Sequence, residues 1–435
     1  MSPALLLLAA VVLLEVGLQF GGPTLPYWLP LVFLVPSFCC MIAAFAAERK
    51  TRGHEPVSGH WLAIALCVLL AVTFKEYPGM YVKDAAYNAR AMAWTGIFLA
   101  YALFRVWAGD RYEKTQRYGF WIAIGGFLFL RAGMLFASPE PYIDVYSMIT
   151  QGTANLLQGR NPFVYPIRDI YNGSMSWCYT MAAYSYPPSN LIPHALAQWF
   201  AGDIRAATVV ADIVSALLLL DIGRRTLDRG RGELLALLYL AQPRSLFVLE
   251  QGWTEPLLSC VFLFFVWLWT RGYKKTALTA YGYLLSLKQY LVFTALHVLI
   301  LERRWKHLLI IAVAGIAATV PFLIWDAPSV IREGFLMQLS TCYRANTPSI
   351  ASLFHAATGI VPGKFWTIAL GIGSAAFFPW WLKGLPPLRR YVYCTLGSLF
   401  SLFLLGSQGI LNYYTLVATL LILTLCLPQE EANNH

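Results

Sequence analysis

Residues 28–47 read WLPLVFLVPSFCCMIAAFAA, twenty residues without a charged side chain. A helix rises about 1.5 Å per residue, so this stretch reaches about 30 Å, the thickness of the hydrocarbon core of a bilayer. Arg49, Lys50 and Arg52 follow at once, and such basic clusters stay on the cytoplasmic side. The stretch therefore predicts a transmembrane helix that ends in the cytoplasm.

Twelve further apolar runs repeat the pattern. They cover about 4–20, 60–75, 92–108, 118–136, 204–222, 233–249, 255–270, 276–301, 307–325, 364–382, 391–406 and 409–427. The 435 residues are 58% hydrophobic and 12% charged, with a mean hydropathy of +0.58, whereas soluble domains have about 45–50% apolar and about 25% charged residues. This composition excludes an ordinary soluble enzyme and a disordered chain. It predicts an all-α polytopic transmembrane bundle of about 13–14 spans.

The net charge of +10 is a topology signal. Twenty of the 32 Lys and Arg residues lie in short loops at 49–52, 105–117, 224–231, 271–275, 303–306 and 383–390. The positive-inside rule makes these loops cytoplasmic, which puts the segments 137–203 and 326–363 outside. A nucleic-acid partner is not expected, because binding one would require the charge on a single soluble face.

This topology divides the chain into four regions. They are N-terminal transmembrane helices (1–136), an extracytoplasmic loop with amphipathic helices (137–203), a transmembrane core with the outer loop 326–363 (204–427) and a cytoplasmic tail (428–435). The run at 188–200 is too short to span and is expected to lie in the outer leaflet. The run at 276–301 has basic loops on both sides, so it is expected to form two short helices that meet near Lys288.

The loop 137–203 holds the polar residues with the clearest pattern. Asp144 comes first, and an amphipathic stretch follows with Val145, Met148 and Ile149 on one face. Gly159-Arg-Asn-Pro162 ends this stretch, and Tyr186-Pro-Pro188 begins the next helix. A long outer loop with little regular structure is usually functional.

The order of these elements resembles the GT-C glycosyltransferases, with family 87 and the first GPI mannosyltransferase as the most similar branches. The matching elements are Asp144 with its amphipathic helix, Leu157-Gln-Gly-Arg-Asn-Pro-Phe163, Tyr186-Pro-Pro188, Gly252-Trp-Thr-Glu255, Ser286-Leu-Lys288-Gln-Tyr290, Arg344-Ala-Asn346-Thr-Pro-Ser349 and Asn412-Tyr-Tyr414. The chain departs from the family in two ways. Four or five spans precede the Asp144 loop, where the family more often has one, and Asp144 has no immediate acidic neighbour.

The resemblance implies a hexosyltransferase, with mannose as the expected sugar, that uses a polyprenyl-phosphate sugar as donor. The acceptor would be a lipid-linked saccharide or glycan on the extracytoplasmic face of a bacterial inner membrane, and no metal or other cofactor is expected. Asp144 is the expected catalytic base. The expected substrate-binding residues are Tyr186, Arg244, Gln251, Glu255, Lys288, Tyr290, Arg344, Asn346 and Asn412.

The chemistry of such a transfer fits these residue types. A lipid phosphate is a good leaving group, so the reaction needs one base for the acceptor hydroxyl and cations for the phosphate. A carboxylate at the membrane boundary is a stronger base because partial desolvation raises its pKa. Direct attack with one base implies inversion at the sugar carbon. Lys288 with either Arg244 or Arg344 is expected to contact the phosphate.

Structural roles remain open for the same residues. Asp144 is also a favoured residue for capping the helix at 145–158, and Glu255 for a first helical turn. Lys288 could extend to water, and Arg131 and Arg244 could pair with Glu140 or Glu250. Two other functions also remain open, a transporter or flippase of lipid-linked saccharides and a non-catalytic subunit of a glycan assembly complex.

Two cysteines fall in the predicted outer loops, Cys178 and Cys342. An extracytoplasmic compartment favours disulfides. A Cys178–Cys342 bridge would join the Asp144 loop to the Arg344 loop.

Overall fold

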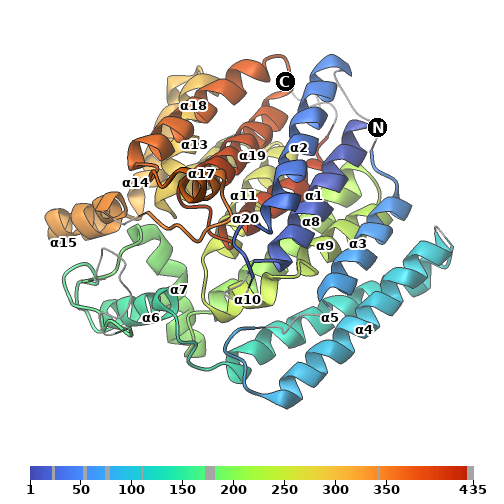
Figure 1. Cartoon of the computed structure of the whole chain (residues 1–435), viewed down its shortest axis with the longest axis horizontal. Helices are drawn as coiled ribbons and strands as arrows, with labels where there is room; N and C mark the ends of the chain where they lie inside the picture. Colours follow the sequence, from blue (N-terminus) through green and yellow to red (C-terminus); the bar gives the residue numbers. More distant parts are fainter. Residues whose placement is uncertain are drawn as a thin grey trace.

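The computed structural model describes residues 1–21, 25–51, 56–73, 79–109, 111–171, 182–340 and 343–428, and within these ranges it contains helices and no strand (Figure 1). The helices are α1 (Pro3–Gln19), α2 (Leu31–Thr51), α3 (Gly59–Thr73), α4 (Ala85–Ala108), α5 (Glu113–Ala137), α6 (Asp144–Leu157), α7 (Pro188–Ala201), α8 (Ala206–Thr226), α9 (Arg229–Leu240), α10 (Ser245–Glu250), α11 (Glu255–Thr270), α12 (Lys274–Leu285), η1 (Gln289–Leu291), α13 (Val292–Leu301), α14 (Trp305–Ala317), α15 (Val320–Ile331), η2 (Arg332–Leu336), α16 (Met337–Ser340), α17 (Ile350–Thr358), α18 (Lys364–Trp381), α19 (Pro387–Leu405) and α20 (Tyr413–Thr424). The predicted all-α class is confirmed.

Among the residues that the structure describes, four helices are long and apolar enough to cross a membrane, namely α2, α4, α5 and α8. A fifth span is counted if α14 and residues 320–336 are taken together, although they meet at an angle of 68°. Several other apolar helices, such as α1, α11 and α20, are shorter than 18 residues. The chain is therefore a helical protein with several helices able to span a membrane, and the larger number of spans stays a prediction.

Two apolar runs are broken where the sequence predicts continuous helices. The run 307–325 breaks between α14 and α15, where Pro321 lies in the first turn of α15. The run 233–249 breaks between α9 and α10, around Pro243. Proline lacks an N–H and is well accommodated in a first helical turn but disfavoured in a helix interior, although α2, α7 and α18 keep Pro36, Pro193 and Pro379 inside them. In both runs, proline overrides the apolar pattern.

The prediction that 276–301 forms two short helices that meet near Lys288 is confirmed. Helix α12 ends at Leu285, and Lys288 lies in extended backbone before η1 and α13. Gly282 allows α12 to pack closely on α14, because an added Cβ there would lie 2.4 Å from the carbonyl oxygen of Ile311. The break places Lys288 in a backbone segment between two helix ends.

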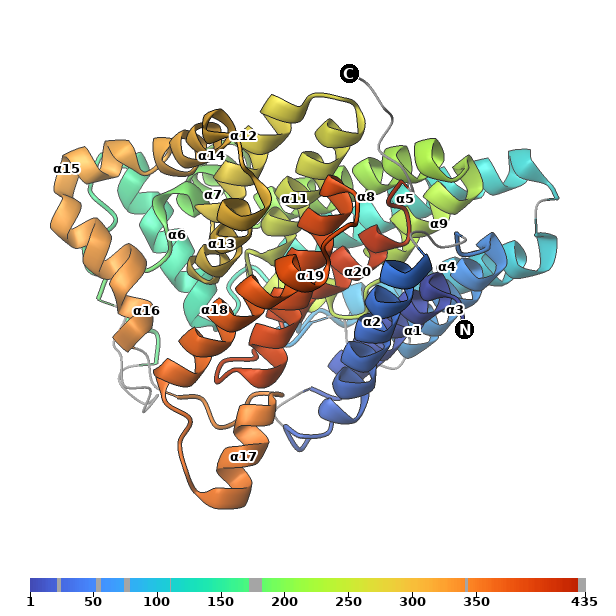
Figure 2. The same cartoon turned by 90° about the horizontal axis from the view of Figure 1, so that it is seen from above.

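The two helices predicted within 137–203 are confirmed as α6 and α7, and their place outside the membrane stays a prediction. They pack on each other and, with α15, lie on one side of the molecule, whereas α4 and α5 lie on the opposite side (Figures 1 and 2). A small hydrophobic core of their own supports them, which includes Ile149, Phe163, Leu191 and Trp253. Trp253 belongs to the turn between α10 and α11, so this core attaches α6 and α7 to the central helices.

Buried ion pairs join the helices of the main core. Arg131 of α5 binds Asp212 of α8 at 2.8 Å, and Arg389 of α19 binds Glu48 of α2 at 3.1 Å. Charges inside apolar helices are costly unless they are paired. The alternative that Arg131 pairs with Glu140 is wrong, because α5 packs against α8 and brings Asp212 to the guanidinium.

Candidate functional site

Lys288 lies inside a cage of four aromatic rings. Its ammonium nitrogen is 4.8 Å from the ring centre of Tyr413, 5.3 Å from Tyr186, 5.5 Å from Tyr290 and 5.9 Å from Trp253. Rings at such distances attract a cation through their negative faces. Lys288 is only 2% exposed, so the alternative that it extends to bulk water is wrong. The cage thus holds a positive charge that is largely shielded from water.

Glu255 supplies the counter-charge of Lys288. It opens α11, and its Oε1 accepts hydrogen bonds from the Lys288 ammonium and, at 3.4 Å, from the Tyr290 hydroxyl. The side chain of Glu255 is fully buried (0%), and its Oε2 has no hydrogen-bond partner among the described residues. An unpartnered buried carboxylate oxygen is rare in a purely structural pair, because leaving it unpaired costs free energy.

A cavity of about 750 Å³ begins at this cage. Lys288, Tyr186, Tyr290 and Tyr413 line one part of it. Most of its remaining wall is apolar and comes from α13, α14, α15, η2 and the end of α19, with residues such as Phe293, Ile316, Leu323, Phe335 and Leu402. Its size is within the range of pockets that bind small organic ligands. The combination of one caged cation and a long apolar wall suits an amphiphile with an anionic head.

Asp144 lies at the first residue of α6, directly after the N-cap position of Ile143. Its Oδ1 accepts the N–H of Val145 at 2.8 Å, and its own N–H donates to the Tyr171 hydroxyl at 3.2 Å. Burial raises the pKa of Asp144, an effect that the nearby positive charge of Arg344 opposes. Asp144 thus has a helix-end hydrogen bond and also the raised basicity that a proton acceptor needs.

Arg344 is the cation that the structure brings to Asp144. The two residues come from different segments of the chain, and the positive charge of Arg344 lies close enough to act on the Asp144 carboxylate. Asn346, two residues further on, is exposed. Of the two arginines predicted at the phosphate, Arg344 is therefore placed near the predicted base.

Arg244 is placed elsewhere. Its guanidinium donates to the carbonyl oxygens of Leu18 at 3.2 Å, Gln19 at 3.4 Å and Gly21, at the C-terminal end of α1. A cation is favourable at a helix C-terminus. The alternative pairing with Glu250 is wrong, because Glu250 accepts the N–H groups of Met80 at 2.5 Å and Tyr81 at 2.8 Å. Arg244 therefore holds α1 against α10.

The turn between α10 and α11 connects the Asp144 region with the Lys288 cage. Gln251 accepts the indole N–H of Trp253 at 2.8 Å, and the Trp253 ring belongs to the cage. Gly252 has a positive φ of 69°, and an added Cβ would lie 3.5 Å from the Tyr146 ring of α6. Gly252 thus lies against the first turn of α6, and the next residue, Trp253, belongs to the cage.

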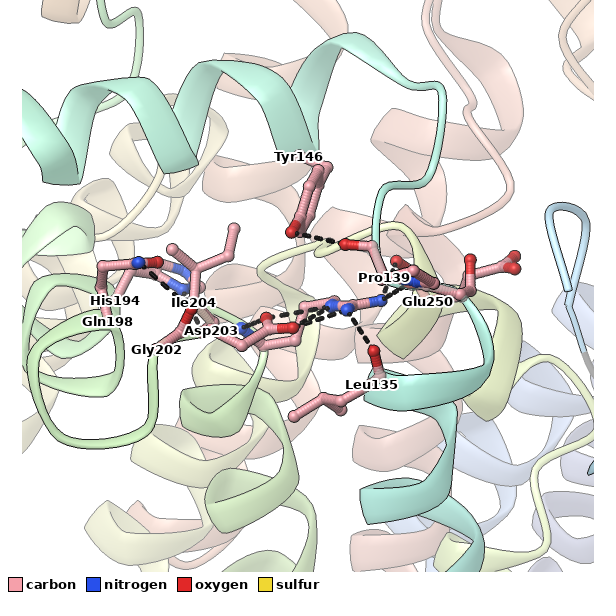
Figure 3. Close-up of polar contacts among 11 residues, drawn as sticks. Leu135, Pro139, Tyr146, His194, Gln198, Gly202, Asp203, Ile204 and Glu250 are labelled. Atoms are coloured by element: carbon pink, nitrogen blue, oxygen red, sulfur yellow. Dashed lines mark hydrogen bonds and ion pairs between the residues drawn. The ribbon is translucent and has the colours of Figure 1, made fainter.

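Arg205 fixes this turn from below. Its fully buried guanidinium (0% exposed) donates to the carbonyl oxygens of Ser138 at 2.7 Å, Leu135 at 3.1 Å and Glu250 at 3.3 Å, and it pairs with Asp203. Figure 3 shows Leu135, Asp203 and Glu250 converging at this point, with Tyr146 above them bonded to Pro139. One side chain therefore holds the end of α5, the end of α10 and the start of α8 together.

Asn412 comes just before α20 and is 2% exposed. Its amide oxygen and nitrogen both lack a hydrogen-bond partner among the described residues. Tyr413, the next residue in the chain, belongs to the cage, with its ring centre 4.8 Å from the Lys288 ammonium. Asn412 thus has unpartnered polar atoms directly before a cage residue in the chain.

The structure brings Tyr186, Glu255, Lys288 and Tyr290 together and joins Gln251 to them through Trp253. Sequence reasoning missed Trp253 and Arg205, because their partners are distant in the chain. The Gly252-Trp-Thr-Glu255 motif was the only signal for Trp253. The predicted Cys178–Cys342 disulfide lies outside the described residues.

Comparison with protein-family models, curated proteins and solved structures finds no match. The functional argument therefore rests on the cage, the cavity and the residues around Asp144.

Proposed function

We propose that this chain is an integral membrane glycosyltransferase that takes a hexose, in our view mannose, from a polyprenyl-phosphate sugar. The observation that carries the proposal is the Lys288 cage at one end of an apolar cavity of about 750 Å³. An isoprenoid chain fits the apolar wall, and a phosphate fits a caged ammonium. The acceptor is a lipid-linked saccharide or glycan.

Asp144 acts as the base in this proposal. It takes the proton of the acceptor hydroxyl as the hydroxyl oxygen attacks C1 of the sugar, and the bond from C1 to the phosphate oxygen breaks. Direct attack gives inversion at C1. The raised pKa of Asp144 makes it a better proton acceptor than an ordinary aspartate. Arg344, close to Asp144, stabilises the negative charge of the leaving phosphate.

The location follows from the charge pattern of the loops. With the basic loops in the cytoplasm and about 13–14 spans, the site would lie on the extracytoplasmic face of a bacterial inner membrane. The polar groups of the site come from the outer loops and helix starts, which favours transfer on one face over transport. A flippase would need polar groups along a complete path across the bilayer.

The test is release of free lipid phosphate from a polyprenyl-phosphate hexose by the purified protein in nanodiscs. We expect release that depends on an added acceptor and is lost in Asp144→Asn. Transport of the intact donor between leaflets, without release, would instead support a flippase. Neither release nor transport by an intact, donor-binding protein would support a non-catalytic subunit.

A further inference from the structure

We propose that Glu255 makes the cage select lipid phosphodiesters over lipid phosphomonoesters, an inference that rests on the proposed function. It concerns the charge of the ligand head and adds a specificity role to a residue that pairs with Lys288.

The geometry separates the two approaches to Lys288. Lys288, Tyr186, Tyr290 and Tyr413 line the cavity, so a phosphate reaches the ammonium from that side. Glu255 is fully buried in the first turn of α11 and contacts Lys288 and the Tyr290 hydroxyl. A phosphate bound to Lys288 would therefore have the Glu255 carboxylate on the far side of the ammonium.

The charges of Lys288 and Glu255 cancel each other. The Lys288 ammonium attracts a phosphate, and the Glu255 carboxylate repels it. At a separation of about 6 Å and an effective dielectric constant of about 20, the repulsion weakens binding on the order of 10²-fold for each negative charge of the ligand. A diester carries one charge, whereas a monoester approaches two above about pH 6. Glu255 therefore penalises the monoester more.

This difference matters for turnover. The transfer breaks the bond between sugar C1 and the phosphate oxygen and leaves the electron pair on that oxygen. The donor diester thus becomes a monoester in the same cage. A carboxylate that disfavours the second charge helps the spent lipid phosphate to leave and the next donor to bind.

The test compares two short probes that differ by one methyl group, farnesyl phosphate and methyl farnesyl phosphate. Their affinities for the full-length protein in nanodiscs are measured at pH 8 and pH 5.5, with farnesol as the neutral control. Glu255→Gln removes the charge and keeps the shape, and Glu255→Asp keeps the charge. Lys364 also lines the cavity, at the exposed start of α18, so Lys364→Gln controls for a second cation.

At pH 8, we expect Glu255→Gln to shift the ratio of monoester to diester affinity toward the monoester on the order of 10²-fold. We expect Glu255→Asp and Lys364→Gln to keep the wild-type ratio. At pH 5.5 the shift should shrink, because the monoester itself takes up a proton.

Two results overturn the inference in different ways. If both phosphates bind better than farnesol but Glu255→Gln leaves their ratio within threefold of wild type, Glu255 is not a selector, and the proposed function stands. If neither phosphate binds better than farnesol, the cage does not hold a lipid phosphate, and the proposed function fails with the inference.

Discussion

Two buried ion pairs of this protein differ in how completely their carboxylate oxygens are hydrogen-bonded. In the Arg131–Asp212 pair, Asp212 accepts from Arg131 and, at 2.8 Å, from the Tyr239 hydroxyl, and Arg131 also donates to the Leu240 carbonyl at 3.1 Å. In the Lys288–Glu255 pair, Glu255 keeps one oxygen without a partner among the described residues, and Lys288 faces a cavity.

This difference separates a structural pair from a binding pair. A carboxylate with both oxygens hydrogen-bonded, such as that of Asp212, rigidifies the helices that it joins. The Lys288 ammonium has three donors and, among the described residues, one hydrogen-bond partner, Glu255, so it can still bond an acceptor in the cavity. We infer that the Arg131–Asp212 pair joins α5 to α8, whereas the Lys288–Glu255 pair takes part in binding a ligand.

The largest expected effect concerns Asp144, the proposed base, which belongs to neither of these two ion pairs. Asp144→Asn keeps the shape of the side chain but removes the proton acceptor. Transfer should slow on the order of 10²–10⁴-fold, while binding of methyl farnesyl phosphate stays within about threefold. The measurement is single-turnover release of lipid phosphate. Near-normal release would leave Asp144 as a helix-end residue only.

Breaking the structural pair should act on stability. Arg131→Met leaves the Asp212 carboxylate buried without its cation, which costs about 3–5 kcal/mol of the free energy of unfolding. Thermal unfolding in detergent measures the loss. The surviving folded fraction should transfer sugar at the wild-type rate per folded molecule. A folded Arg131→Met protein that fails to bind the phosphate probe would contradict a purely structural role.

The pH dependence of transfer sharpens the assignment of the base. Asp144 accepts a proton only when it is ionised, so activity is present above its pKa and falls as the pH drops through it. Burial raises that pKa above the usual value of about 3.9, so the acid limb should lie above that of an ordinary aspartate. A pH–rate profile of kcat tests this expectation. An acid limb that persists unchanged in the residual activity of Asp144→Asn would belong to another group.

A smaller effect is expected from Arg205, which holds the end of α5, the end of α10 and the start of α8 together. Arg205→Lys keeps the charge but loses the planar group that reaches three carbonyl oxygens, and each unpaired carbonyl costs on the order of 1–3 kcal/mol. The fold should weaken, and kcat should fall several-fold while the probe affinity changes little. Unchanged kcat in the folded protein would show that Arg205 does not position Asp144.

Much of the fold could be predicted from apolar runs and basic loops. The break at Lys288 followed from basic residues on both sides of a run too short for two crossings. The bends at Pro243 and Pro321 were not expected, because apolar composition alone does not show where a helix is interrupted.

The site was predictable only in part. Glu255 and Lys288 were each found in a motif, but their contact joins two helix starts 33 positions apart. Arg244 was expected at the phosphate because of its charge, but its guanidinium lies at the C-terminal end of α1. The packing of α1 decides this position. The role of Arg205 depends on carbonyl oxygens, which carry no signal in a sequence.

The most direct test of the central claim compares two charge-free double mutants. Lys288→Met with Glu255→Met removes the binding pair, and Arg131→Met with Asp212→Leu removes the structural pair. Both replacements exchange a buried pair for apolar side chains, a change that is often tolerated. Binding of methyl farnesyl phosphate to each folded protein is then measured in nanodiscs. Our account predicts that the first double mutant loses the phosphate preference over farnesol and the second keeps it. Equal preference in both would contradict the account.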